Sequence, residues 1–173
     1  QMDGGDRRRA IAALEDAYTL SNGAKDWGTR LASAHATFGL PARCAEVLID
    51  VLPVPPALED LRHWHLLAKV HLTALDEPEA ASDILWALFR AYPDKRATLA
   101  ALEDFYRRNQ NSREFADRMA AILAEGHTRI ANDLASKLWK YVGEVNHAVL
   151  QRPAEAEDAF RRARSLGDQS ADV

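Results

Sequence analysis

The sequence predicts an all-α fold, a right-handed α-solenoid of antiparallel helix pairs. Alanine is abundant, and the long segments contain few runs of β-branched residues, which favours helix throughout. Proline and glycine interrupt the chain at intervals that suit short helices. One spacing of small and apolar residues also recurs along the chain, which indicates a repeat.

The first three predicted helices span 6–20, 26–38 and 41–51. The turn sequence "SNG" ends the first of them, and "GLP" separates the second from the third. Pro41 suits the first turn of a helix, where a missing N–H costs nothing. The segment "PVPP" then stops the third helix, so this part of the chain is expected to hold three short helices.

The next three predicted helices span 57–74, 78–91 and 95–108. Pro78 opens the second of these in its first turn, and Pro93 follows its end. No segment shows the strict alternation of apolar and polar residues that a strand would need, so no strand is predicted.

The last three predicted helices span 112–124, 128–150 and 153–166, and Pro153 opens the final one. Gly126 and Gly167 are expected to follow helix ends as left-handed residues. The closing residues, 169–173, are expected to be a disordered tail.

The repeated spacing places residues at offsets 0, 4, 7 and 12. Small residues at offsets 0 and 7 let a helix approach its neighbour, a larger apolar residue at offset 4 fills the gap beside them, and offset 12 ends the helix. The five sets are Ala10, Leu14, Ala17, Asn22; Pro41, Ala45, Leu48, Pro53; Ala81, Leu85, Leu88, Pro93; Ala116, Ala120, Leu123, Thr128; and Ala156, Phe160, Ala163, Asp168.

This pattern resembles the tetratricopeptide repeat family, in which a helix A with a Trp, Leu, Gly, Tyr pattern precedes a helix B with the spacing above. Residues that fit helix A are Trp139, Val142, Gly143 and Asn146; Trp64, Leu67, Ala68 and His71; more weakly Leu102 and Tyr106; and irregularly Trp27, Leu31 and Ala34. The resemblance implies one repeat domain over 1–168, made of a half repeat at 6–22 and repeats near 26–56, 57–93, 94–126 and 127–168.

The resemblance also implies a non-enzymatic scaffold that binds a protein or peptide in a concave groove lined by A helices. Family geometry would point residues at offsets of -5, -2, +2 and +5 from the helix A leucine position into that groove. Six of the residues at these offsets form the predicted partner-binding set: Arg62, His65, Lys69, Arg107, Lys137 and Lys140.

A basic groove suits an acidic or C-terminal segment of a partner, because charge complementarity steers encounter and disfavours wrong partners. A second interpretation is a solvated helix face whose Lys and Arg stems cover apolar neighbours. Two other functions stay open: a self-assembling module that forms homo-oligomers through its repeat ends, and a recruitment or regulatory segment of a larger multidomain protein. Trp86 is a further candidate, for a protein contact away from the groove.

Composition argues against several classes of function. The net charge of -4 argues against a dedicated nucleic-acid binder. Cys44 is the single cysteine, so no internal disulfide forms, and it is expected to be a buried small hydrophobe. His63, His65 and His71 point in different directions around one helix, so no metal site is predicted.

Motifs for nucleotide binding, metalloprotease action and serine hydrolysis are absent from the sequence, so neither a catalytic residue nor a cofactor is predicted. No apolar run is long enough to cross a membrane, and no direct membrane insertion is expected. The sequence does not fix the compartment: the cytoplasm is favoured, and the periplasm is the alternative if the chain is a fragment. The excess of arginine over lysine hints at a bacterial source.

Overall fold

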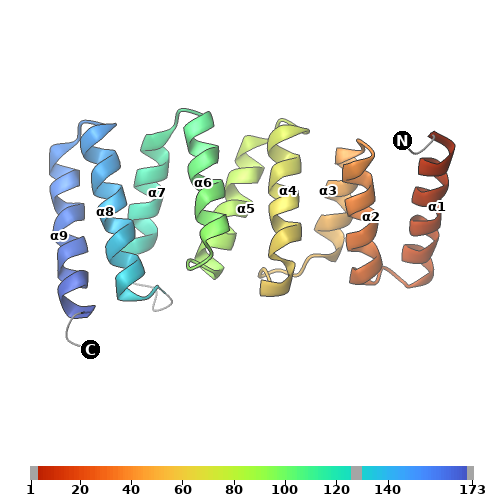
Figure 1. Cartoon of the computed structure of the whole chain (residues 1–173), viewed down its shortest axis with the longest axis horizontal. Helices are drawn as coiled ribbons and strands as arrows, with labels where there is room; N and C mark the ends of the chain where they lie inside the picture. The colour runs from red at the N-terminus through yellow and green to blue at the C-terminus, as the bar shows by residue number, and fades with distance from the viewer. Residues whose placement is uncertain (1–3, 126–129, 171–173) are drawn as a thin grey trace. The chain divides into compact units, whose positions relative to one another are not determined.

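The structure is a computed structural model that describes residues 4–125 and 130–170. All regular structure within these residues is helical, and within each of two units the consecutive helices run antiparallel (Figure 1). The chain divides into two compact units, Gln1–Ala91 and Tyr92–Val173. The division lies beside Pro93, the residue at which the sequence predicts the end of a repeat.

The first unit contains five α-helices in the residues described, and the bounds of each lie close to a predicted helix. A single 3-10 turn at the start of the predicted 57–74 helix is the main difference. In order the elements are α1 (Gly4–Leu20), α2 (Lys25–Thr37), α3 (Pro41–Val51), η1 (Leu58–Asp60), α4 (Leu61–Thr73) and α5 (Pro78–Ala91).

The second unit contains four α-helices in its described residues: α6 (Arg96–Arg108), α7 (Ser112–Ala124), α8 (Asn132–Ala148) and α9 (Pro153–Ser170). Gly126, the predicted end residue after α7, lies outside the described residues.

The prediction that Gly167 ends the last helix is wrong, because α9 continues to Ser170. The Ser136 hydroxyl of α8 donates a hydrogen bond of 2.7 Å to the Ala163 carbonyl, and packing of this kind lets a helix run through a glycine. Two residues of the expected tail are therefore helical, and 171–173 lie outside the described residues.

One turn geometry recurs in the pairs α2/α3, α4/α5, α6/α7 and α8/α9. In each, a residue with positive φ stands two positions before the second helix of the pair: Gly39, Asp76, Gln110 and Gln151. Of these four residues only Gly39 is a glycine. The left-handed conformation is slightly unfavourable for the other three, and polar residues adopt it more readily than β-branched ones.

The residue after each left-handed position donates its backbone N–H to a carbonyl near the end of the preceding helix. The acceptor residues are all buried. The bonds are Leu40 to His35 at 2.8 Å, Glu77 to His71 at 2.9 Å, Asn111 to Tyr106 at 3.1 Å and Arg152 to Asn146 at 2.9 Å. This shared turn fixes the equivalent residues of the four helix pairs.

The turn also corrects the predicted pattern of the first repeat. His35 of α2 and His71 of α4 accept the matching turn hydrogen bonds, so they are equivalent residues. Leu67 and Ala68 stand four and three residues before His71. Their equivalents in α2, Leu31 and Ala32, stand four and three residues before His35, and both are buried. Trp27 and Ala34, which the sequence placed in the pattern, are exposed and half-buried respectively. Leu31 keeps its predicted place, and Ala32 stands at the small-residue position predicted for Ala34, because an alanine-rich helix offers a small residue at several positions.

The predicted helix B positions form much of the core. Ala45, Leu48, Ala81, Leu85, Leu88, Ala116, Ala156 and Ala163 are all buried, as is Cys44. In the first unit they join residues of α2 and α4, including Ala32, Leu67 and Val70. Trp86 is also buried, 3% exposed and edge-on to Phe89 at 5.8 Å between ring centroids, so the interpretation of Trp86 as a surface contact is wrong.

Candidate interaction cleft

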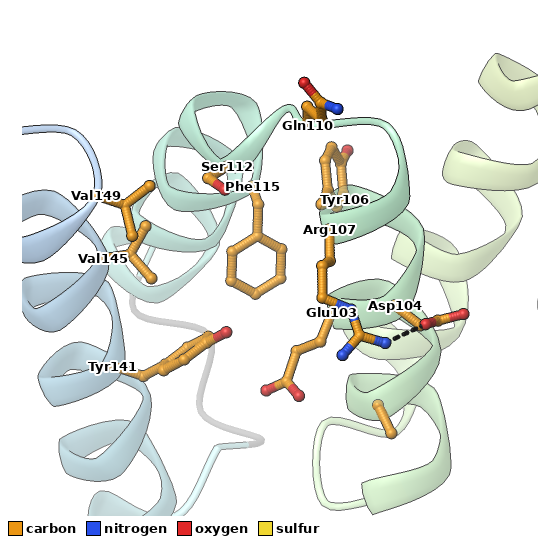
Figure 2. Close-up of a pocket in the computed structure, with 11 residues that line it drawn as sticks. Glu103, Asp104, Tyr106, Arg107, Gln110, Ser112, Phe115, Tyr141, Val145 and Val149 are labelled. Carbon is orange, nitrogen blue, oxygen red and sulfur yellow. Dashed lines mark hydrogen bonds and ion pairs between the residues drawn. The ribbon is translucent and has the colours of Figure 1, made fainter.

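The second unit contains an open cleft of about 710 Å³ between α6, the start of α7, and α8 (Figure 2). This volume lies within the range of small-ligand and side-chain binding sites. The lining residues are Ala100, Glu103, Asp104, Tyr106, Arg107, Gln110, Ser112, Phe115, Tyr141, Val145 and Val149.

Aromatic rings from three helices form the inner wall of the cleft. Phe115 of α7 lies between Tyr106 of α6 and Tyr141 of α8, with ring centroids 5.5 Å and 5.7 Å away. Tyr106 and Phe115 are buried, whereas Tyr141 is half-buried and reaches the cleft surface. Aromatic pairs at these separations stabilise the packing beyond simple burial of area, so the three rings hold the three helices together at this wall.

Polar side chains on α6 form the opposite wall. Arg107 donates a hydrogen bond to Asp104 at 2.5 Å, and Arg108 approaches the same carboxylate at 2.7 Å. The hydrogen bond from Arg107 is the main reason that the pKa of Asp104 lies below its ordinary value. The charges of Asp104 and Arg107 therefore largely satisfy each other within the cleft.

Glu103 is the other charged residue of this wall. It is half-buried, and among the residues that the structure describes it has no hydrogen bond or ion pair. Figure 2 shows its carboxylate and the Tyr141 hydroxyl directed toward each other across the cleft. Burial raises the pKa of Tyr141, and the negative charges of Glu103 and Glu144 raise it further.

The six residues predicted to bind a partner are divided between the two units. Arg62, His65 and Lys69 lie on α4, Arg107 on α6, and Lys137 and Lys140 on α8. Of these, Arg107 lines the cleft; Lys137 and Lys140 are exposed but do not line it.

The three predicted residues on α4 have different surroundings. Arg62 is exposed and donates a hydrogen bond from Nε to Nε2 of His63 at 3.2 Å. His65 is half-buried, and burial lowers its pKa below the ordinary value. Lys69 is exposed. None of these observations tests a role in binding, so the set remains a prediction.

The groove offsets taken from the resemblance overlap with the cleft on α6 and not on α8. Ala100, Asp104 and Arg107, at offsets of -2, +2 and +5 from Leu102, line the cleft, whereas Ala97, at offset -5, does not. On the other side the lining residues are instead Tyr141 and Val145 of α8 and Val149, the residue that follows its end; they lie four residues apart and so share one helix face. That four-residue spacing was the available signal in the sequence.

The candidate histidines do not form a metal site. His63 and His71 are buried, and Nδ1 of His71 lies 2.6 Å from a Glu77 carboxylate oxygen. In the described parts of the chain, no group of three or more His, Cys, Asp or Glu side chains is arranged to hold a metal ion. Among the same residues, no helix is long and apolar enough to cross a membrane.

Comparison with known proteins supports the fold. No protein-family model matches the sequence, and a search of curated proteins finds no significant match. Solved structures do match over nearly the whole chain. A crystal structure of MamA superposes with a TM-score of 0.53 at 17% identity, covering 100% of this chain and 99% of that one.

Two further structures give similar values. A second MamA crystal structure has a TM-score of 0.54 at 16% identity, covering 98% of this chain and 87% of its own. A Podosopora anserina protein, described as a kinesin light chain with nearly identical TPR-like repeats, has a TM-score of 0.52 at 17% identity. It covers 96% of this chain and 89% of its own. The antiparallel helix pairs and these likenesses together show that the chain has a tetratricopeptide-like repeat fold.

Proposed function

We propose that this protein is a non-enzymatic interaction scaffold that holds a segment of a partner protein in the cleft of the second unit. The tetratricopeptide-like fold is typical of such scaffolds, because stacked helices present a large preformed surface. The observation that supports the proposal is the cleft itself. It has an aromatic wall and exposed apolar surface at its rim, and the Glu103 carboxylate in it has no partner among the described residues.

The shape and chemistry of the cleft suit a peptide segment. Val149 is 59% exposed at the rim, and Tyr141 is half-buried, so both offer apolar surface that a partner side chain can cover. Partly exposed aromatic and aliphatic residues beside polar groups are typical of protein-binding sites.

The basic residues predicted from the sequence add a second contact surface to this proposal. Arg62 and Lys69 are exposed on α4, where they would contact acidic side chains of a partner. His65 lies on the same helix, and Lys137 and Lys140 are exposed on α8.

Capture of a partner from the source lysate by three immobilised baits tests the proposal. Val149→Lys places a charge at the rim of the cleft, and Ile49→Lys makes the same change at a residue of α3 that is 62% exposed. We expect Val149→Lys to lose a protein that wild type and Ile49→Lys both retain. If all three baits capture the same proteins equally, the cleft is not the binding surface.

A bait with Arg62→Glu and Lys69→Glu tests the surface on α4 separately. If α4 is a second contact surface for the partner, this variant should lose the same protein while its melting temperature equals that of wild type. Full retention would restrict binding to the cleft and remove these residues from the proposal.

Self-assembly is a second candidate function, and α1 provides the observation that favours it. Ile11, Leu14 and Tyr18 of α1 are only half-buried, and Leu20 is 87% exposed. An apolar helix face that is incompletely covered can pack against another copy. A mass that rises with concentration in light scattering, and that Leu20→Lys returns to the monomer value, would establish self-assembly; a constant monomer mass would exclude it.

A further inference from the structure

The charges in the cleft indicate what kind of side chain it can accept. Three charged residues line it, and two of them, Asp104 and Arg107, form an ion pair. Glu103 has no hydrogen bond or ion pair with any described residue. Glu103 is therefore the carboxylate of the cleft that stays available to a partner, beside an aromatic wall.

We infer that the cleft binds a lysine or arginine side chain of the partner segment, with Glu103 as its anionic contact and Tyr141 as its aromatic contact. This inference rests on the proposed function, because it names the chemistry of the segment that the cleft would hold. It assigns the cleft a basic partner residue, whereas the predicted groove residues favour an acidic one.

Glu103 and Tyr141 are arranged so that one cation can meet both. They stand on opposite walls, on α6 and α8, and their polar ends are directed toward the same space (Figure 2). The charged end of such a side chain can donate a charge-assisted hydrogen bond to the Glu103 carboxylate and a second hydrogen bond to the Tyr141 hydroxyl oxygen, while its aliphatic stem packs along the ring.

The raised pKa of Tyr141 agrees with this placement of charge. Burial is the largest cause, and the carboxylates of Glu103 and Glu144 are the others. A negative potential that disfavours the phenolate at this position favours a bound cation there.

The remaining lining residues suit the rest of a basic side chain. Ala100, Val145 and Val149 provide apolar surface around the polar end of the cleft. Lysine and arginine carry long aliphatic stems that cover such surface while their charged ends reach an anion. An apolar residue next to the basic one in the partner would extend this contact.

An acidic segment fits the cleft less well. Its carboxylates would approach Glu103 with like charge, and contact with Arg107 would compete with the existing bond to Asp104. Like charges brought together at an interface disfavour binding and are a common source of specificity.

Selection from a library of random displayed 12-residue peptides tests the inference without knowledge of the natural partner. The baits are the unmodified 173-residue chain, Glu103→Gln, and Glu79→Gln as the matched control. Glu79 is exposed in the first turn of α5, in the other unit, so its substitution removes the same charge away from the cleft.

We expect the wild-type and Glu79→Gln chains to select peptides enriched in lysine or arginine, and Glu103→Gln to lose that enrichment. A selected peptide should bind Glu103→Gln about tenfold more weakly than wild type, as for the loss of one charge-assisted contact. Replacing its arginine with citrulline, a neutral isostere, should weaken binding to wild type by a similar factor and to Glu103→Gln much less.

The failures of the two proposals are distinguishable. Suppose that Val149→Lys no longer binds the selected peptides, but that these peptides are enriched in acidic residues or show no preference for basic ones. This result would overturn the inference and leave the proposed function standing. Peptides that bind Val149→Lys as well as wild type, or no selection above background, would overturn both.

Discussion

The aromatic ring of Phe160 occupies the space that a side chain at Gly143 would need. A Cβ atom built on Gly143 would lie 2.7 Å from Cε1 and 2.8 Å from Cδ1 of that ring. Gly143 belongs to α8 and Phe160 to α9, so the missing side chain sets how closely the two helices of this pair approach. An analogous contact exists in the first unit, where a Cβ on Gly28 would lie 2.5 Å from Cγ1 of Val51.

Gly143→Ala is therefore expected to destabilise the protein. Forcing a methyl group against a packed ring costs about 1 to 3 kcal/mol, and the better helix propensity of alanine returns at most about 1 kcal/mol. Urea unfolding measures the net loss. Gly167→Ala is the matched control in α9, because its Cβ would meet only Ser136 Oγ at 3.4 Å, and it should unfold no earlier than wild type.

Leu85→Ala tests the helix B core of the first unit. Leu85 is 4% exposed in α5, so its truncation leaves a cavity and should cost about 2 to 5 kcal/mol. Thermal or urea unfolding provides the measurement. Wild-type stability in this variant would show that the repeated spacing does not define the core.

The ion pair between Lys25 and Asp60 should matter more than a pair at the surface. The Lys25 Nζ lies 2.9 Å from Asp60 Oδ2, and the Asp60 side chain is only 4% exposed. Lys25→Met leaves that buried carboxylate without its partner, which is unfavourable. Lys95→Met removes an exposed partner from Asp94 and should change the urea midpoint less. Equal midpoints for the two variants would contradict this ranking.

Stability should fall as the solution is acidified from about pH 7.5 to about pH 5.5, around the ordinary histidine pKa of about 6.5. Burial is the main reason that His35, His63 and His65 have pKa values below that value. In the folded protein they stay neutral to lower pH, while the unfolded chain takes up protons as the pH falls through 6.5. The stabilisation that these neutral histidines give is thus present above about pH 6.5 and is lost as the pH falls below it.

Urea midpoints across this range measure the effect, and a variant with His63→Gln should show a weaker pH dependence than wild type. His63 faces Asp60, whose charge raises its pKa, and Arg62 and Lys25, whose charges lower it. A midpoint that does not change with pH, or that rises on acidification, would contradict the assigned direction.

The helices could be predicted from the sequence because their signals are local. Pro41, Pro78 and Pro153 each stand at the first residue of a helix, where proline is favoured. The core residues of helix B were also predictable, since Ala81, Leu85 and Leu88 follow a fixed spacing on one helix face.

The turns and part of the cleft depend on contacts that the sequence does not display. Asp76, Gln110 and Gln151 take the left-handed conformation without being glycine, because the neighbouring helices impose the turn. The rotation of α8 that brings Tyr141 and Val145 into the cleft is set by its packing against α7 and α9. The offset rule taken from the family resemblance therefore gives residues that line the cleft on α6 but none that line it on α8.

Chemical-shift mapping of a selected peptide on the isotopically labelled 173-residue chain tests the central claim most directly. If the cleft of the second unit is the binding site, backbone amide shifts should concentrate on α6 near Glu103 and Arg107, on α7 near Phe115, and on α8 near Tyr141 and Val149. Shifts concentrated instead on α1–α5, or on residues of α7–α9 outside the cleft such as Ala120 and Ala159, would contradict it.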